Sequence, residues 1–466
     1  MSQTAAEIRS QLNHPVVDAD GHLIESVPLL ADYMRDEAGA AATDEFLAQL
    51  GHVTLPSDRH WAEAEESARK RRLPAAPWWG SPADALDRAT ALLPSLFVER
   101  LEELGIDFSI VYPTLGLMLV SHPDESMRVG GCRALNAYLA DRVGPHPERL
   151  TAAAMVPMHS PSEAIETIDH ALDELGHRCI VMPSWVKRTS LDGTYADVFG
   201  IDSDYDYDAV WQHCLDRGVA VTAHGGSMGF GFRQSPSRYM FNHIGHFAAA
   251  GEGFAKALFF GGVPKRFPEL PFAFLEAGVA WGAQLLADLL SRWEKRGGEN
   301  IRHLDPARLD VEAFNRLLDK HGDEHFARAD VREHATSLNS GHPPELDEFH
   351  RCGLRDEQDL IRTFASSFFF GCEADDPFVG LAYDGRVSGP GQALRPLFGS
   401  DVGHWDVQDM RGVLPEAFEL VDDGVLDEEQ FRQFACDNAI RLHTRVNPSF
   451  FDGTAVESYA RALGKG

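Results

Sequence analysis

The sequence predicts an α/β protein, a (β/α)8 TIM barrel with helical insertions, in a single domain spanning residues 1–466. Short apolar runs alternate with amphipathic helical patterns, which is typical of parallel strands joined by helices. Eight such runs are present, the number that a closed barrel of this kind needs. The expected strands are 15–20, 108–114, 150–158, 179–184, 219–226, 271–279, 368–374 and 397–403.

Helix signals and insertions fall between these runs. Residues 160–177, SPSEAIETIDHALDELGH, begin with Ser and Pro in a capping pattern and end near a glycine, which predicts a helix. Two segments do not follow the alternation, and we expect insertions at about 33–95 and 291–365. The second is strongly charged and helical in pattern. We therefore expect it to pack over the barrel mouth or into a subunit interface.

Composition narrows the class of protein. The chain has 72 acidic and 42 basic residues, a formal net charge of −30, so nucleic acid and anionic membranes are not expected partners. Six scattered cysteines without a CxxC pair predict neither a disulfide framework nor a cysteine-rich zinc site. No apolar run resembles a signal peptide or a membrane span. We expect a cytoplasmic protein with a small-molecule substrate, assembled as a homo-oligomer or with a homologous subunit.

Candidate metal ligands follow the expected strands. In VVDADGHLIE (16–25), Asp20 and His22 lie two residues apart and therefore project to the same side of a strand. The carboxyl ends of barrel strands meet at one mouth, where the chemistry of this fold takes place. Further histidines and carboxylates at strand ends are His224, Glu276, Glu373, Asp401 and His404. Together they predict a metal site at the mouth.

Each of these residues also has a structural interpretation. Asp20 or Asp401 alone is consistent with a turn or a helix cap, and His224 alone with a buried core histidine. Glu373 is equally compatible with a position on the rim. Glu276 lies inside an apolar run, where a carboxylate is costly unless it is paired or bound to a metal.

Two further histidines follow the fifth expected strand. In YMFNHIGHF (239–247), His243 and His246 are three residues apart, which predicts that they share one face of a helix. They either cap the helix and line the substrate pocket, or bind a second metal together with Glu25. The full donor set contains oxygen and nitrogen but no thiolate, which suits iron or manganese as well as zinc.

At the level of motifs, the chain resembles the amidohydrolase-related TIM-barrel metalloenzymes, close to aminocarboxymuconate-semialdehyde decarboxylase. The resemblance covers about 15–290 and 365–445. It rests on DADGH, ELGIDFSIVYPT, RLTAAAMVPMHSPSEAIETI, AHGGS, FFGGVPKRFPELPFAFLEAGVAW, FGSDVGH and DNAIRLH. It implies metal ligands at Asp20, His22, His224 and Asp401. The chain departs from the family with Asp at position 20 and with Glu276 in place of a catalytic histidine.

The resemblance leaves the function open. The carboxylate-rich site and the extra histidines resemble a subgroup of dinuclear non-heme oxygenases that includes 2-aminoisobutyrate hydroxylase, which implies an iron–iron or iron–manganese monooxygenase acting on a carboxylate- or thioester-bearing molecule. The alternative is a mononuclear zinc or manganese hydrolase or non-oxidative decarboxylase, and a third possibility is a non-catalytic partner of an active homologue. Two sets of residues carry these interpretations. Glu276, Asp401 and His246 are the expected catalytic residues, and Trp281, Glu373 and His404 the expected substrate contacts, with Phe230 at the mouth and Arg233 or Arg238 available for a carboxylate.

Overall fold

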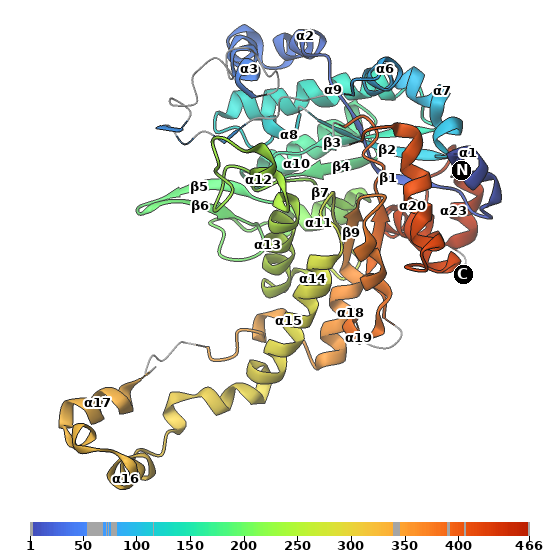
Figure 1. Ribbon diagram of the computed structural model, residues 1–466. Helices are drawn as coiled ribbons and strands as arrows, with labels where there is room; N and C mark the ends of the chain where they lie inside the picture. Colours follow the sequence, from blue (N-terminus) through green and yellow to red (C-terminus); the bar gives the residue numbers. More distant parts are fainter. Residues whose placement is uncertain are drawn as a thin grey trace.

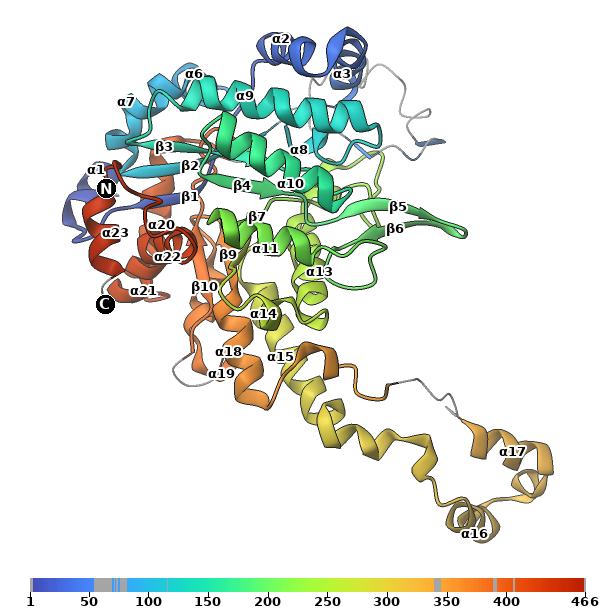
Figure 2. The same ribbon diagram turned by 180° about the vertical axis from the view of Figure 1, so that it is seen from behind.

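The computed structural model describes residues 3–53, 69–70, 72, 74–75, 82–114, 116–338, 345–388, 392–404 and 407–464. Eight strands form one parallel sheet in the order β1-β2-β3-β4-β7-β8-β9-β10. Two backbone hydrogen bonds close the sheet between its first and last strands: Asp401 N–H donates to Asp20 O (2.9 Å) and His22 N–H donates to Val402 O (2.8 Å). Helices cover the outside of the sheet (Figures 1 and 2). The predicted (β/α)8 barrel is confirmed.

Every expected strand overlaps a barrel strand, although β1 continues past the expected 15–20 and β10 begins before the expected 397–403. The barrel strands are β1 (Val17–Leu23), β2 (Phe108–Pro113), β3 (Leu150–Met155), β4 (Cys179–Met182), β7 (Val221–Ala223), β8 (Phe272–Phe274), β9 (Phe368–Cys372) and β10 (Arg395–Phe398). An antiparallel hairpin, β5 (Val186–Ser190) and β6 (Gly193–Asp197), follows β4 and was not predicted. Its two-residue turn is Leu191 and Asp192, and Gly193 (φ 138°), which follows the turn, is a signal that sequence reasoning missed.

Helices surround the barrel and connect its strands. Before β4 they are α1 (Ala5–Gln11), α2 (Val27–Glu37), α3 (Gly39–Val53), α6 (Ala85–Leu92), α7 (Pro94–Leu104), α8 (Gly116–Leu119), α9 (Gly131–Val143) and α10 (Pro161–Asp169). After β4 they are α11 (Asp208–Arg217), α12 (Tyr239–His243), α13 (His246–Phe260), α14 (Val263–Arg266), α15 (Ala280–Arg296), α16 (Val311–His321), α17 (Ala329–Ser337), α18 (Glu357–Ser367), α19 (Gly385–Ser388), α20 (Val413–Asp422), α21 (Glu428–Arg432), α22 (Asn438–Thr444) and α23 (Glu457–Leu463). In the described part of the chain, none of them has the length and apolarity needed to cross a lipid bilayer.

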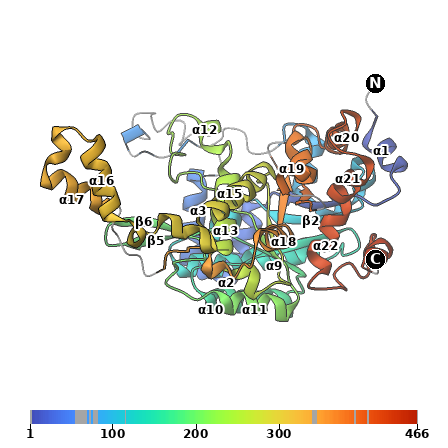
Figure 3. The ribbon, with the colours of Figure 1, turned by 90° about the horizontal axis from the view of Figure 1, so that it is seen from below.

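The predicted insertions have different outcomes. The first, at about 33–95, lies partly outside the described residues, and its described part contains the end of α2, all of α3 and α6, and the first residues of α7. The second contains an arm, residues 298–338, that extends away from the barrel (Figures 1–3). No residue of the arm is buried.

The arm leaves the barrel at its base. Phe349, which follows the arm, packs its ring against Trp293 of α15 (5.4 Å between centroids) and against Phe260 (5.2 Å). Phe260 is the last residue of α13, at the end that leads through α14 to the start of β8. The prediction that this insertion covers the barrel mouth is therefore wrong, because its attachment is at the opposite end of the strands. A role in a subunit interface remains a prediction.

We predict that the barrel folds without the arm. The backbone N–H of Gly298 donates to Asp347 Oδ2 (2.9 Å), so a short Gly-Ser linker can replace residues 299–346. Because the arm contributes no buried side chain, the melting temperature of the barrel should change by no more than a few degrees. Thermal unfolding tests this, and loss of cooperative unfolding would contradict it. Sedimentation of the same variant tests the predicted interface. If the arm forms a subunit interface, the variant should form a smaller assembly than the full chain.

Candidate metal centre

Five side chains from four strand ends converge at one place. Asp20 and His22 belong to β1, whereas His224, Glu276 and Asp401 follow β7, β8 and β10. His22 Nε2 lies 3.6 Å from Asp20 Oδ1 and 3.2 Å from Asp401 Oδ1. His224 Nε2 lies 3.9 Å from Asp20 Oδ1 and 3.3 Å from Glu276 Oε2. We call these five residues the ligand group.

The ligand group suits a divalent cation. One donor atom each from Asp20, His22 and His224 lie within 4.8 Å of one another, and so do donor atoms of His22, Glu276 and Asp401. Asp20 Oδ1 and the Nε2 atoms of both histidines are buried and have no hydrogen-bond partner among the described residues. Buried polar atoms without partners are rare and costly, and a metal ion would satisfy them. Oxygen and imidazole donors are compatible with manganese, iron or zinc.

The electrostatics of the ligand group favour neutral imidazoles. Burial is the main cause that lowers the pKa of His224 to about 3, and the neighbouring His404 lowers it further. Burial also holds the pKa of His22 well below its ordinary value. The pKa of Asp20 is raised well above its ordinary value, first by burial and then by the charge of Asp401. A neutral histidine is the form that binds a metal, and a cation would offset the repulsion between the carboxylates.

Two of the ligand-group residues have unusual backbone conformations. Glu276 (φ 52°) and Asp401 (φ 48°) both lie in the left-handed region, which non-glycine residues seldom adopt. Such conformations cost on the order of 1–3 kcal/mol and are concentrated at functional sites. His404 supports Asp401: its Nδ1 lies 3.0 Å from Asp401 Oδ2, and its ring stacks on His22 with centroids 4.7 Å apart. His404 therefore contacts two members of the ligand group.

Asp18 holds the strands beneath the ligand group and was not singled out from the sequence. Its Oδ1 accepts from the backbone N–H groups of Asp20 (3.1 Å) and Ser400 (2.9 Å). Its Oδ2 accepts from the hydroxyls of Ser109 (2.5 Å) and Ser400 (2.8 Å). Asp18 is fully buried and thus ties β1 to β2 and to the loop after β10. The cost of burying a carboxylate is the signal that would have identified it.

A bulge in β1 depends on this arrangement. The register with β2 shifts between Asp18 and Gly21. A Cβ on Gly21 would lie 2.5 Å from both Asp18 Oδ2 and Ser109 Oγ, so only glycine fits here without moving the carboxylate. Asp20 lies within the bulge and His22 after it, and their side chains still project together, as the alternation of side chains along a strand predicts.

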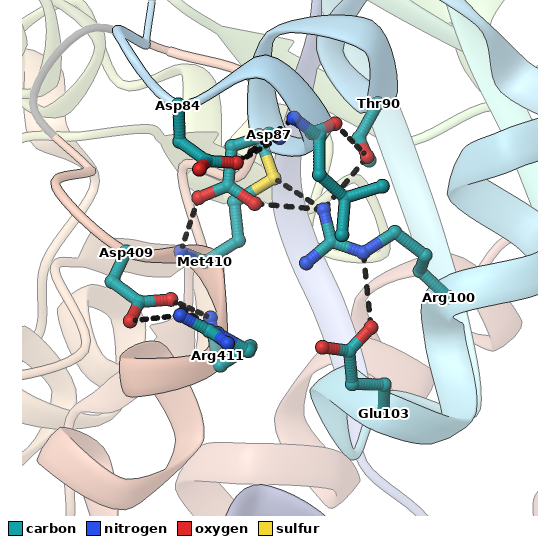
Figure 4. A network of polar contacts seen from close by, with 9 residues as sticks. Asp84, Asp87, Thr90, Arg100, Glu103, Asp409, Met410 and Arg411 are labelled. Atoms are coloured by element: carbon teal, nitrogen blue, oxygen red, sulfur yellow. Dashed lines mark hydrogen bonds and ion pairs between the residues drawn. The ribbon is translucent and has the colours of Figure 1, made fainter.

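The loop that carries Asp401 and His404 is also fixed from outside the barrel (Figure 4). Asp87, on α6, accepts at Oδ2 from the backbone N–H of Met410 (3.2 Å) and at Oδ1 from the Arg100 guanidinium (2.7 Å). Arg100, on α7, also donates to Thr90 Oγ1 (2.8 Å). Asp87 and Arg100 are both buried, so this ion pair anchors the far end of the loop.

His243 and His246 do not share a helix face, contrary to expectation. Gly245 (φ 69°) ends the turn of α12, which contains His243, and His246 begins α13. The two rings still pack with centroids 4.8 Å apart. The pKa of His246 is lowered to about 3, mainly by burial and then by His243 and His224. Neither histidine belongs to the two groups of converging donors among the described residues, so both lie beside the ligand group and outside it.

The remaining expected site residues have separate outcomes. The Trp281 ring packs against Phe274 (5.4 Å between centroids) and Phe370 (5.2 Å), so it is part of the aromatic layer around β8 and β9, and its contact with substrate stays a prediction. Glu373 is partly exposed after β9, and its charge is one of the causes that raise the pKa of Asp20. Glu25 is buried and accepts at Oε1 from the backbone N–H of Thr114 (3.1 Å).

We predict that Asp18→Asn destabilises both the fold and the ligand group. An amide cannot accept four hydrogen bonds, because its NH2 group would face donors. The free energy of unfolding should fall by about 2–4 kcal/mol, and the bound metal should decrease. Urea denaturation and elemental analysis measure the two effects. Asp32→Asn, which removes an exposed charge on α2, is the control, and an equal effect of both substitutions would argue against a special role of Asp18.

Known structures share this fold, although no protein-family model matches the chain. An amidohydrolase from Mycobacterium avium subsp. paratuberculosis K-10 is 17% identical, with 92% of this chain and 99% of that chain covered and a TM-score of 0.54. The IDCase of Metarhizium anisopliae, in its apo form, is 14% identical (93% and 98% covered, TM-score 0.55). A dihydroxybenzoic acid decarboxylase from Polaromonas sp. JS666, with bound manganese and the inhibitor 2-nitroresorcinol, is also 14% identical (92% and 97% covered, TM-score 0.51). At identities this low, the similarity establishes a common fold and nothing more.

Proposed function

We propose that this protein is a divalent-metal-dependent enzyme of the amidohydrolase type that cleaves a carboxylate-bearing small molecule without O2. The observation that carries this proposal is the ligand group itself, in which two buried neutral imidazoles and three carboxylates converge at the ends of four barrel strands. Among cleavage reactions, non-oxidative decarboxylation is the first candidate and hydrolysis the second. The manganese in the decarboxylase of the same fold supports this order, since the oxygen-rich ligand group suits manganese.

The residues of the ligand group would have two roles, metal binding and proton transfer. Asp20, His22, His224 and Asp401 would hold the ion, which when bound supplies a positive charge for a substrate oxygen and can lower the pKa of a water molecule. Glu276 is placed to exchange a proton with the substrate. In a decarboxylation, the bond between the carboxylate carbon of the substrate and the carbon that bears it breaks, and CO2 leaves. The carbon that bore the carboxylate then takes a proton from the Glu276 carboxyl. His404 keeps Asp401 oriented through its 3.0 Å contact.

A dinuclear oxygenase is the second candidate function, and one specific observation favours it. Both ring nitrogens of His246 are buried and lack a hydrogen-bond partner among the described residues. The neighbouring His224 is one of the groups that lower the pKa of His246. An imidazole in this state is available to a second metal ion. His243, packed on the His246 ring, would be the next donor.

Metal content and oxygen dependence separate the two candidates. For the proposed decarboxylase or hydrolase we expect one divalent ion per chain in protein purified without added metal. We also expect product from hydroxybenzoates or other carboxylates under strictly anaerobic conditions, with CO2 released from a carboxyl-labelled substrate. Elemental analysis and isotope-ratio mass spectrometry measure these quantities. Two ions per chain that include iron, together with product formed only in the presence of O2, would instead establish the oxygenase.

The variant Glu276→Gln tests the proton-transfer role. The amide keeps the size of the side chain but cannot donate a carboxyl proton. We therefore expect kcat to fall by about 100-fold or more while the single metal ion stays bound. Glu269→Gln is the control, because Glu269 precedes β8 at the other end of the strand and its side chain is 74% exposed. A loss of metal in Glu276→Gln and in His246→Ala, with kcat falling in proportion, would favour two ions sharing these ligands.

A further inference from the structure

A closed loop borders the ligand group on the side of β7. We call residues 227–246, between β7 and α13, the strap. Ser227 donates to the carbonyl of His246 from both its backbone N–H (3.2 Å) and its hydroxyl (2.9 Å), which joins the two ends. The fully buried Asn242 accepts from Ser235 N–H (2.7 Å) and donates to Ser235 O (2.8 Å), which fixes the middle. The strap therefore has one defined shape, with α12 as its helical part (Figure 1).

The strap exposes several large apolar side chains. Its large exposed apolar residues are Met228 (38%), Phe232 (94%), Met240 (48%), Phe241 (59%) and Ile244 (68%). Large exposed apolar side chains next to a site commonly mark a binding surface. Because the strap follows the carboxyl end of β7, these residues lie at the mouth through which a substrate reaches the ligand group.

The strap also differs in charge from the rest of the chain. No Asp or Glu occurs between Asp216 and Glu252, although the chain has 72 acidic residues in 466. The strap itself carries two arginines and two histidines. The net charge of the molecule is −30, but the lack of acidic residues in the strap means that an anion approaching the site along the strap is not repelled by it.

Arg233 is placed to bind that anion. Its Nη2 donates to Gly245 O (2.9 Å), which holds the guanidinium against the strap. Its Nε is buried and has no hydrogen-bond acceptor within the described part of the chain. Gly245 directly precedes His246, and the charge of Arg233 is one of the causes that lower the pKa of His246, so the guanidinium lies near that histidine. A planar guanidinium with a free donor is suited to a carboxylate.

We infer that the strap is the substrate-recognition element for an organic anion with an apolar body, in which Arg233 binds an anionic group and the exposed Phe and Ile side chains cover the hydrocarbon part. This inference rests on the proposed function, because the ligand for the strap is taken to be the substrate of the ligand group. A membrane surface is less compatible with the same features, since the overall charge of −30 repels anionic lipid.

Binding of 4-phenylbutanoate, compared with its uncharged isostere 4-phenylbutanamide, tests the inference. Isothermal titration calorimetry of the full chain gives the affinities. Trp185 reports locally by fluorescence, because its ring packs on Phe230 (4.8 Å between centroids) and its Nε1 donates to Gly226 O (3.0 Å). We expect the carboxylate to bind at least about tenfold more tightly than the amide, with or without metal, since a charge-assisted hydrogen bond is made only by the acid.

Variants of two strap arginines locate the effect. Arg233→Gln should abolish the preference for the acid, and Arg233→Lys should restore part of it. Arg238→Gln should leave it unchanged, because Arg238 is exposed and donates to the carbonyl of its neighbour Ser237 (2.8 Å). Phe232→Ser with Phe241→Ser should weaken acid and amide alike. Melting temperatures equal to that of the unaltered chain establish that each variant is folded.

Several results would overturn the inference. These are no binding of 4-phenylbutanoate, equal affinities for acid and amide, an unchanged preference in Arg233→Gln, or a preference that requires metal and therefore belongs to the ligand group. Sedimentation with vesicles of phosphatidylcholine and phosphatidylglycerol, or self-association lost in the double Phe variant, would assign the apolar surface to a membrane or to a second copy. Failure of the proposed function would appear differently. The protein would then bind no metal or show no turnover, but the strap would still bind 4-phenylbutanoate.

Discussion

The carboxylate of Asp18 is the contact on which the geometry of the candidate centre depends. It accepts four hydrogen bonds from β1, β2 and the loop after β10, and it is fully buried. These bonds fix the bulge that orients Asp20 and His22, and they hold Ser400, the residue before Asp401, in place. A buried carboxylate is tolerated only when its oxygens are satisfied, so any shift of these strands would leave costly unpaired groups. The rigidity of the ligand group follows from this constraint.

Charge is distributed unevenly around the barrel mouth. The ligand group concentrates three carboxylates in a buried space, where burial favours neutral imidazoles and raises the pKa of Asp20. Such a site is stable with a bound cation and attracts one from solution. The strap beside it contains no acidic residue in a strongly acidic chain. A site that holds a cation next to an approach that accepts an anion is consistent with an enzyme for organic acids.

The arm and the strap lie at opposite ends of the barrel. The arm leaves at the base, where Phe349 packs between Trp293 and Phe260, and the strap lies at the mouth. The arm has exposed apolar residues such as Leu317 and Leu338 but no buried one, whereas the strap is closed by internal hydrogen bonds. The Asp87–Arg100 pair adds a third element, because it anchors the loop that carries Asp401 and His404 from the outer helices.

The sequence by itself determined the barrel and the members of the ligand group. Short apolar runs between helical patterns located all eight strands, and the position of a residue at a strand end is enough to place it at the mouth of this fold. Only the tertiary structure decided the rest, since it depends on contacts between residues far apart in the chain. Asp18 gains its role from Ser109 and Ser400, the positive φ of Gly245 divides His243 from His246, and Trp281 packs into the aromatic layer because Phe274 and Phe370 surround it. The direction of the arm was likewise beyond the sequence, because a charged helical pattern specifies a helix but not the surface against which it lies.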